Sequence, residues 1–190
     1  MQPDKNPQKI MNLFNEISTY YDLMNNLISL GTHYIIKYLV IKELEIKPRT
    51  IVLDLCCGTG DFTKIMSKLY PRSKIIGLDF SPEMLKISKL KNKNGVFMQG
   101  DCTNLPFKNG EIDCITMGFG LRNIQDRQKA IKEIYRVLTD SGKFLQLDFG
   151  YHNKVSKIFN FIVPIFAKIC RTNPEHYSYL LISKETFPEP

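Results

Sequence analysis

The sequence predicts an α/β fold, in which a mostly parallel sheet carries helices on both faces and an N-terminal helical cap. Three observations lead to this prediction. Between Ile51 and Asp79, an apolar run, a glycine turn, a helix-spaced segment and a second apolar run follow one another. Three more short apolar runs follow further along the chain. Apolar residues also recur at helical spacing between Ile10 and Tyr38.

The length and composition indicate a single globular domain over residues 1–190. We expect a helical cap (1–45), a core that carries the binding site (46–150) and an apolar helical segment on the substrate side (151–190). The net charge of +7 is spread along the chain without a basic tract. It fits an ordinary solvated surface, and the alternative is attraction to an anionic membrane or to nucleic acid.

The cysteines indicate a reducing compartment. There are five of them and no C-x-x-C pair, so we expect free thiols and no metal site. The N-terminus has no secretory or transit pattern, and no apolar run reaches the roughly 18 residues that span a bilayer. We therefore expect a cytoplasmic protein.

The first 45 residues are expected to form a loose polar arm (1–9) followed by two or three helices. The breaks are expected near Ser18 and Gly31, and the last helix is expected to continue to about Glu45. Tyr21 and His33 belong to a set of polar side chains larger than a packing helix needs. Two interpretations remain open: a cap with polar outer positions, or a lid over the binding edge.

The first crossover has the features of a nucleoside site. Gly58 and Gly60 permit close approach of the backbone to a ligand, and the following helix offers unpaired N–H groups. Asp79 comes 19 residues after Gly60, close to the spacing at which an acid meets ribose hydroxyls. Asp54, at the strand end, suits a ligand that carries positive charge. The alternative is a tight strand–helix turn that binds nothing.

The remaining core elements follow in order. Ser81 and Pro82 begin a helix over 82–91, and a third strand covers Val96–Gln99. Asp101 follows this strand and either caps the next turn or contacts a ligand. Further elements are a fourth strand (112–117), a glycine-rich loop (118–123), a helix (125–138), a stop at 140–142 and a fifth strand (144–147) that ends on Asp148.

The stretch Val155–Cys170 is strongly apolar and is interrupted by Pro164. It forms either a buried helix pair kinked at the proline or an apolar surface for a lipid or lipophilic substrate.

Several of these motifs resemble those of the class I S-adenosylmethionine-dependent methyltransferases. They are Leu53-Asp54, Gly58-Thr59-Gly60-Asp61, Asp79, Asp101, Leu105-Pro106-Phe107 and Arg136-Val137-Leu138. Four more resemble the quinone-biosynthesis C-methyltransferases of the menaquinone/ubiquinone type. These are Tyr21-Asp22-Leu23-Met24-Asn25, Ser29-Leu30-Gly31-Thr32-His33, Gly118-Phe119-Gly120-Leu121-Arg122-Asn123, and Tyr177-Ser178-Tyr179-Leu180 with Phe187-Pro188. The resemblance covers residues 10–188, and the F-G-L-R-N loop is its most specific element.

The resemblance implies a Rossmann-like class I methyltransferase fold and S-adenosyl-L-methionine as the cofactor. It places Gly58, Thr59 and Gly60 around the methionine part and Asp79 on the ribose. Asp101 and Cys102 would meet the adenine. The other cofactor-side residues are Asp54 and Gly118.

The resemblance also implies C-methylation of a prenylated quinol ring, on demethylmenaquinol or its benzoquinol counterpart. We expect Arg122 to stabilise the developing phenolate or to orient a water, and Asn123 to hold the loop. Asp148, Tyr21 and His33 are candidates for the path of the proton. The alternatives are another small lipophilic acceptor, or a shortened, cofactor-binding but inactive subunit.

The family's final antiparallel strand pair is expected to be missing after Pro190. The fifth strand would then be an unprotected sheet edge. Either the chain is a fragment or shortened form, or a partner subunit covers this edge. A homodimer is also expected. We expect a small lipophilic quinol as partner and contact with the periphery of the inner membrane. No nucleic-acid partner is expected, since no aromatic-flanked basic cluster is present.

Overall fold

The centre of the molecule is a five-stranded parallel sheet. The structure is a computed structural model that describes residues 4–93, 95–148 and 179. The strand order is β3-β2-β1-β4-β5, and every pair is parallel. The strands are β1 (Ile51–Leu55), β2 (Lys74–Asp79), β3 (Val96–Gln99), β4 (Ile112–Gly118) and β5 (Leu138–Leu147). The predicted α/β fold with a parallel sheet is confirmed. The predicted apolar segment and the proposed loss of a final strand pair concern residues outside this description.

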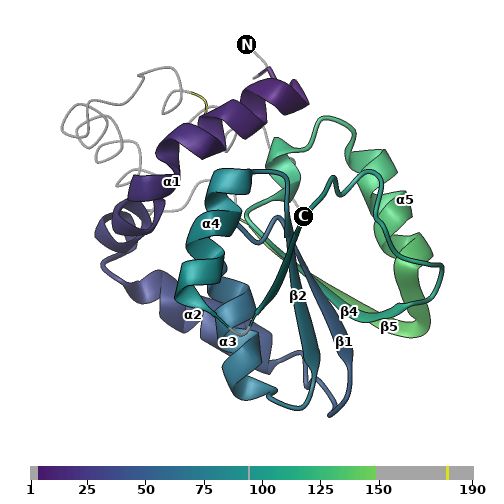
Figure 1. The fold of residues 1–190 in the computed structure, drawn as a ribbon. Coiled ribbons are helices and arrows are strands. Elements are labelled where there is room, and N and C mark those ends of the chain that lie inside the picture. The colour runs from purple at the N-terminus through teal and green to yellow at the C-terminus, as the bar shows by residue number, and fades with distance from the viewer. Residues whose placement is uncertain (1–3, 94, 149–178, 180–190) are drawn as a thin grey trace.

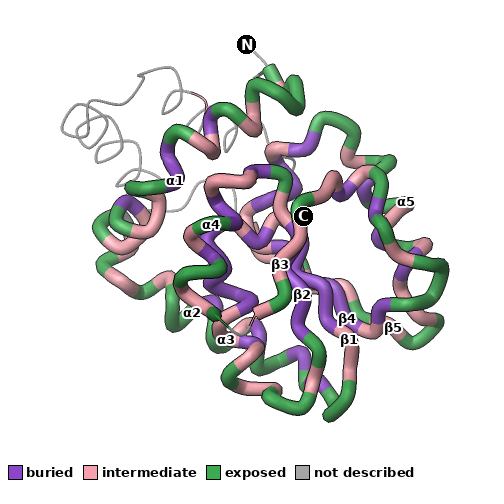
Figure 2. The backbone as a smooth tube through the Cα atoms, viewed as in Figure 1, coloured by how far each residue is buried: buried purple, intermediate pink, exposed green. Residues whose placement is uncertain are grey.

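Helices cover both faces of the sheet, as Figure 1 shows. They are α1 (Pro7–Ser29), α2 (Thr32–Lys42), α3 (Asp61–Leu69), α4 (Pro82–Lys91), the short 3₁₀ helix η1 (Leu121–Asn123) and α5 (Arg127–Val137). One core packs the sheet against α5, around Leu53, Ile115 and Ile134. A second core packs the other face against α2 and α3, around Val52 and Met66. Since both faces are covered, the central strands are apolar nearly throughout, and Figure 2 shows them buried.

The N-terminal cap differs from the prediction in two places. The chain is already helical from Pro7, because the Asn6 side chain accepts hydrogen bonds from the backbone N–H groups of Gln8 and Lys9. The expected break near Ser18 is wrong: α1 is continuous, and the Ser18 hydroxyl donates to the carbonyl of Asn15. The break near Gly31 is confirmed.

The transition from α5 to β5 also differs from the prediction. The helix ends at Val137, and the expected stop at 140–142 lies inside β5. The strand pairing is irregular there: β4 advances from Ile112 to Cys114 while β5 advances from Leu138 to Lys143. The extra residues of β5 are taken up in a bulge, which periodicity alone does not reveal.

Arg136 fastens the loop before β4 to α5. Its guanidinium donates to the backbone carbonyls of Leu105 and Phe107 at 3.0 and 2.8 Å, and it pairs with Glu133. Glu133 in turn accepts from the backbone N–H of Leu105 at 2.8 Å. Two motifs that lie far apart in the sequence, Leu105-Pro106-Phe107 and Arg136-Val137-Leu138, are therefore one structural unit.

The cap carries large apolar side chains on its outer surface. Their exposed fractions reach 51% at Leu23, 61% at Ile35 and 89% at Leu30. Within the part of the chain that the structure describes, no helix combines the length and the apolar character needed to cross a bilayer.

Asp54 joins three elements beneath the binding edge. Its side chain on β1 is buried and accepts from the backbone N–H and hydroxyl of Thr63 on α3, at 3.0 and 2.6 Å. It also accepts from the hydroxyl of Thr116 on β4 at 3.0 Å. Burial raises the pKa of Asp54 to about 7, and the bonds from the two threonines oppose this rise.

We expect Asp54 to make the folded state less stable as the pH rises. Its pKa is about 7 in the folded chain, against an ordinary value of 3.8. The folded state therefore holds this proton more tightly, and the stabilisation is complete below about pH 4 and is lost as the pH rises to 7. The loss is up to about 1.4 kcal/mol per pH unit in the free energy of unfolding. Urea unfolding at several pH values measures it.

The matched variant is Asp54→Asn, which keeps an acceptor for Thr63 and gains a donor for Thr116. Its unfolding free energy should lack this component of the pH dependence, while Asp140→Asn on the exposed surface should retain it. Parallel pH curves for the unmodified chain and Asp54→Asn would contradict the assignment.

Candidate functional site

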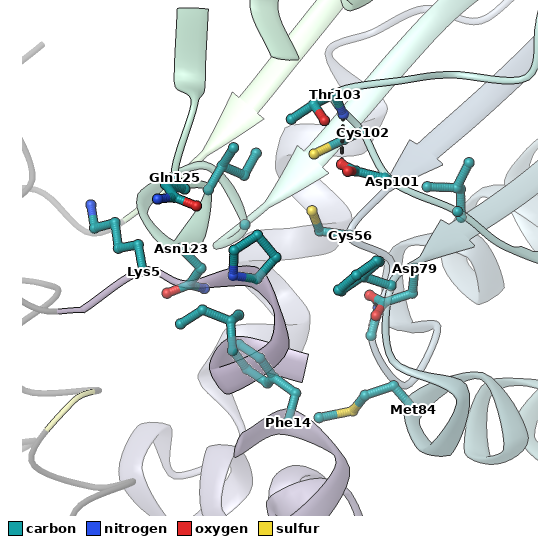
Figure 3. Close-up of a pocket in the computed structure, with 18 of the residues that line it drawn as sticks. Lys5, Phe14, Cys56, Asp79, Met84, Asp101, Cys102, Thr103, Asn123 and Gln125 are labelled. Atoms are coloured by element: carbon teal, nitrogen blue, oxygen red, sulfur yellow. Dashed lines mark hydrogen bonds between the residues drawn. The ribbon is translucent and has the colours of Figure 1, made fainter. Parts of the chain in front are cut away.

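A cavity of about 270 Å³ lies at the carboxyl edge of the sheet, beneath the first turns of α1. The ends of β1, β2, β3 and β4 form its floor and one wall, and Phe14 and Tyr21 of α1 contribute to the opposite side. Figure 3 shows Asp79, Asp101 and Cys56 on the strand side, with Asn123 and Lys5 across the cavity. The lining is largely apolar with a few polar groups, which is the character of a small-molecule site.

Asp79 is one of two acidic residues on the strand side, the other being Asp101. One carboxylate oxygen accepts from the backbone N–H of Gly58 and the other from that of Ser81, both at 2.8 Å. Burial raises its pKa, and these backbone bonds oppose the rise. A carboxylate oxygen has two lone pairs, so each oxygen can accept a further hydrogen bond from a ligand.

Asp101 and Cys102 lie one strand further along the same edge. Asp101 accepts from the backbone N–H of Thr103 at 2.8 Å, so it does cap a turn, and it also lines the cavity. The two interpretations of Asp101 are therefore compatible. Cys102 is buried and faces Cys56, whose pKa is raised by its hydrogen bond to Cys102 and by burial. Cys56 thus remains a neutral thiol.

The turn after β1 has an unusual backbone. Gly58 and Gly60 have φ values of 54° and 83°, and Cys56 also adopts a left-handed conformation, with φ 52°. At Gly60 a Cβ atom would lie only 2.9 Å from the Cβ of Ser88, so glycine is required there for packing as well as for conformation. Non-glycine residues at positive φ are uncommon and cluster at functional sites.

A second, smaller cavity of about 40 Å³ adjoins the first. The two share Tyr21, Cys56, Gly58, Gly118 and Phe119 as lining residues. The residues found only around the small cavity differ in character, because most of them are charged or polar. They are Lys37, Asp54, Cys57, Thr59, Asp61 and Phe62.

Asp61 holds two lysines beside the small cavity. Lys37 of α2 and Lys91 of α4 approach its two oxygens at 2.8 and 2.5 Å. Burial by itself would raise the pKa of Asp61; the two lysines outweigh it and hold the pKa below its ordinary value. Lys91 also pairs with Asp22 of α1 at 2.8 Å, and Asp22 accepts from the Thr59 hydroxyl. The cap and the glycine turn are thereby joined by one polar network.

Arg122 and Asp148 form a buried pair, with Nη1 to Oδ1 at 2.5 Å. The Arg122 guanidinium lies 5.9 Å from the ring centre of Phe119, which lines both cavities. Asn123 donates to the carbonyl of Phe119 at 3.3 Å and accepts from the Tyr179 hydroxyl at 3.2 Å. Burial raises the pKa of Tyr21, while the charge of Arg122 opposes the rise.

The predicted site residues fall into three groups. Those lining the large cavity are Tyr21, Gly58, Asp79, Asp101, Cys102, Gly118 and Asn123. Asp54 and Thr59 line only the small cavity. Arg122, Asp148, His33 and Gly60 line neither. Of these, His33 lies 3.9 Å from Asp61, and burial lowers its pKa. His33 bonds to the hydroxyl of Ser29 at 2.6 Å.

Sequence reasoning missed Lys37, Asp61 and Lys91. A signal was present at Lys37, a lone charge in the apolar run from Tyr34 to Ile41. A lone lysine inside such a run either reaches water with its charged end or meets a buried acid. Here the side chain is 9% exposed and meets Asp61.

The comparisons with known proteins identify the family of this chain. Residues 2–190 match the model of the ubiE/COQ5 methyltransferase family. The demethylmenaquinone methyltransferase of Staphylococcus carnosus is 39% identical over 192 residues, which cover 96% of this chain and 80% of that protein. The protein of the same name from Staphylococcus aureus strain JH9 is 36% identical over 193 residues, with the same coverage.

Solved structures share the fold. The YcgJ protein from Bacillus subtilis superposes with a TM-score of 0.55 at 29% identity, covering 68% of this chain and 56% of that one. A SAM-dependent methyltransferase from Aquifex aeolicus gives a TM-score of 0.60 at 21% identity, covering 70% of this chain and 74% of that one. With the family model matching almost end to end, the chain belongs to the ubiE/COQ5 methyltransferase family.

Proposed function

We propose that this chain transfers a methyl group from S-adenosylmethionine to a ring carbon of a prenylated quinol, demethylmenaquinol, in respiratory quinone biosynthesis. The observation that carries the proposal is the 39% identity with the S. carnosus demethylmenaquinone methyltransferase along 96% of this chain. The benzoquinol counterpart and other small lipophilic acceptors are the competing substrates.

The donor set of the large cavity fits the proposed cofactor. The spare lone pairs of Asp79 suit the two ribose hydroxyls, and those of Asp101 suit the adenine amino group. Phe80 and Met84, which also line the cavity, offer apolar contact for the base. Gly58 leads from there into the small cavity, which would take the methionine part. When bound, S-adenosylmethionine supplies a methyl group on a positively charged sulfur.

The residues of the glycine-rich loop (118–123) would prepare the acceptor. A quinol ring carbon becomes nucleophilic when the neighbouring hydroxyl loses its proton. Arg122 stays charged, and its position behind Phe119 would stabilise the resulting phenolate without touching it. Tyr21, Asp148 and His33 remain the candidates for the path of the proton. The apolar lining would exclude water and hold the ring against the methyl group.

The predictions about location, membrane contact and oligomeric state remain proposals. They are a cytoplasmic location, contact with the periphery of the inner membrane, and a homodimer. The lipophilic acceptor supports the membrane contact, since a prenylated quinol dissolves in the bilayer.

The proposed activity is tested directly by turnover. The purified chain should methylate a short-chain demethylmenaquinol, and mass spectrometry of the quinone fraction should show one added methyl group per ring. The benzoquinol counterpart and a simple naphthol serve as competing acceptors. Methylation of the naphthol alone would favour a different phenolic substrate, and cofactor binding without transfer to any quinol would favour an inactive subunit.

Asp79→Asn should weaken cofactor binding. The substitution replaces one of two accepting oxygens by an amide that cannot accept, so one ribose hydroxyl loses its partner. We expect the affinity for S-adenosylhomocysteine, measured by titration calorimetry, to fall roughly 10- to 100-fold. Glu83→Gln on the first turn of α4 is the matched control and should bind normally. An unchanged affinity of Asp79→Asn would remove Asp79 from the site.

Arg122→Gln should impair turnover more than cofactor binding. The substitution removes the positive charge near the proposed phenolate, and we expect kcat to fall roughly 100- to 1,000-fold. Because Asp148 would lose this ion pair inside the protein, the double variant Arg122→Gln/Asp148→Asn separates lost folding from lost chemistry. Both variants should bind S-adenosylhomocysteine within about threefold of the unmodified chain. Full turnover by either would exclude the assigned role.

A further inference from the structure

Lys37 lies at the wall of the small cavity, where its ammonium group pairs with Asp61. It lies on α2 between apolar neighbours, its side chain is 9% exposed, and its Nζ is 2.8 Å from Asp61 Oδ2. Tyr34, one turn earlier, places its ring centre 5.9 Å from the same nitrogen. A buried lysine needs such partners, because desolvation disfavours its charged form.

The two lysines that pair with Asp61 differ in how many N–H donors remain for a ligand. An ammonium group has three N–H donors. Lys91 directs its donors to Asp22, Asp61 and Thr59, at 2.8, 2.5 and 3.2 Å. Within residues 4–93, 95–148 and 179, the hydrogen bond found for Lys37 is the one to Asp61. Lys37 lines the small cavity and Lys91 does not. Lys37 therefore retains donors at a wall that a ligand can reach.

The small cavity also favours an anion through its backbone. It lies at the N-terminus of α3, where the cap residue Gly60 supplies no side-chain hydrogen bond. The backbone N–H of Thr63 at this end already donates to Asp54, while the N–H groups of the two residues before it and the helix dipole favour negative charge. Lys37 and the helix end together form a site for a carboxylate. Lys91 is already bonded to Asp22 and Asp61, and Asp54 is bonded to Thr63 and Thr116.

Resting on the proposed function, we propose that Lys37 donates a hydrogen bond to the α-carboxylate of the cofactor's methionine part. The two cavities share Gly58 and Tyr21, so a ligand whose ribose meets Asp79 extends across the glycine turn toward Lys37. The cap helix α2 thus recognises the amino-acid end, and ligands without that carboxylate lose this contact. Lys37 is a specificity-determining residue for the cofactor.

The test compares two ligands that differ in one group. S-Adenosylhomocysteine carries the carboxylate, and S-adenosyl-3-thiopropylamine is the same molecule without it. We measure both affinities by titration calorimetry for the unmodified chain and for Lys37→Met, whose side chain has similar length and no charge. The affinity of Lys37→Met for S-adenosylhomocysteine should fall roughly 10- to 100-fold. Its affinity for the amine should change by less than about threefold.

Two further variants keep the comparison decisive. Lys42→Met, exposed on the same helix, should bind both ligands as the unmodified chain does. Lys37→Met removes one of the two cations that pair with Asp61 and could prevent folding. In that case the double variant Lys37→Met/Asp61→Asn also removes the Asp61 charge. It should show the same loss of affinity for S-adenosylhomocysteine and not for the amine. Equal loss of both ligands would assign Lys37 a purely structural role and overturn the inference.

The outcome also separates this inference from the proposed function. Binding of both ligands to the unmodified chain with no selective effect of Lys37→Met overturns the role of Lys37 and leaves the proposed function intact. Failure of the folded, unmodified chain to bind either ligand overturns the proposed function, and the inference falls with it.

Discussion

The arrangement of the site depends on Asp61, the first residue of α3. A carboxylate is favoured there by the helix dipole, and it brings Lys37 of α2 and Lys91 of α4 into one buried cluster. The ion pair found for Lys37 among the described residues is the one with Asp61, while Lys91 also pairs with Asp22. Removing one partner from such a cluster leaves an uncompensated buried charge, at a typical cost of about 3–5 kcal/mol. The ion pairs of Asp61 thus help to fix the cap to the core, and apolar packing fixes it elsewhere.

The fixed position of the cap over the sheet determines which chemistry the protein can perform. The strand ends supply acids that suit the hydroxyl and amino groups of a nucleoside, while the cap supplies Phe14 and Tyr21 across the cavity. A ligand between them would be enclosed by these two walls. Methyl transfer needs alignment and exclusion of water more than acid–base power, and this is what two preformed walls provide. The buried Arg122–Asp148 pair lies behind Phe119, whose ring lines both cavities.

The sequence predicted the parts of this structure that depend on local patterns. Apolar runs followed by glycine or an acid located the five strands of the described sheet, although β5 begins six residues before the predicted strand. The spacing between Gly60 and Asp79 pointed to the sheet edge at which the large cavity lies. The continuity of α1 through Ser18 was not predictable from periodicity, because its hydroxyl is satisfied within the helix by Asn15. The contacts of Asp61 were missed for a different reason. They join residues 24 and 30 positions apart, and no local pattern encodes which charges meet.

The hydrogen bonds of α1 also constrain the order of folding. Asn15 accepts from the hydroxyl of Ser81, and Asp22 accepts from Thr59 and Lys91, across separations of 37 to 69 residues. During synthesis α1 is made before these partners, and the last of them, Lys91, is made only when α4 is complete. Contacts between residues this far apart must wait until the intervening chain has been made, whereas a helix forms from neighbouring residues. The tertiary hydrogen bonds of α1 therefore form only after α4 has been made, and until then the side chains that α1 buries, such as Leu13 and Ile17, remain exposed to water.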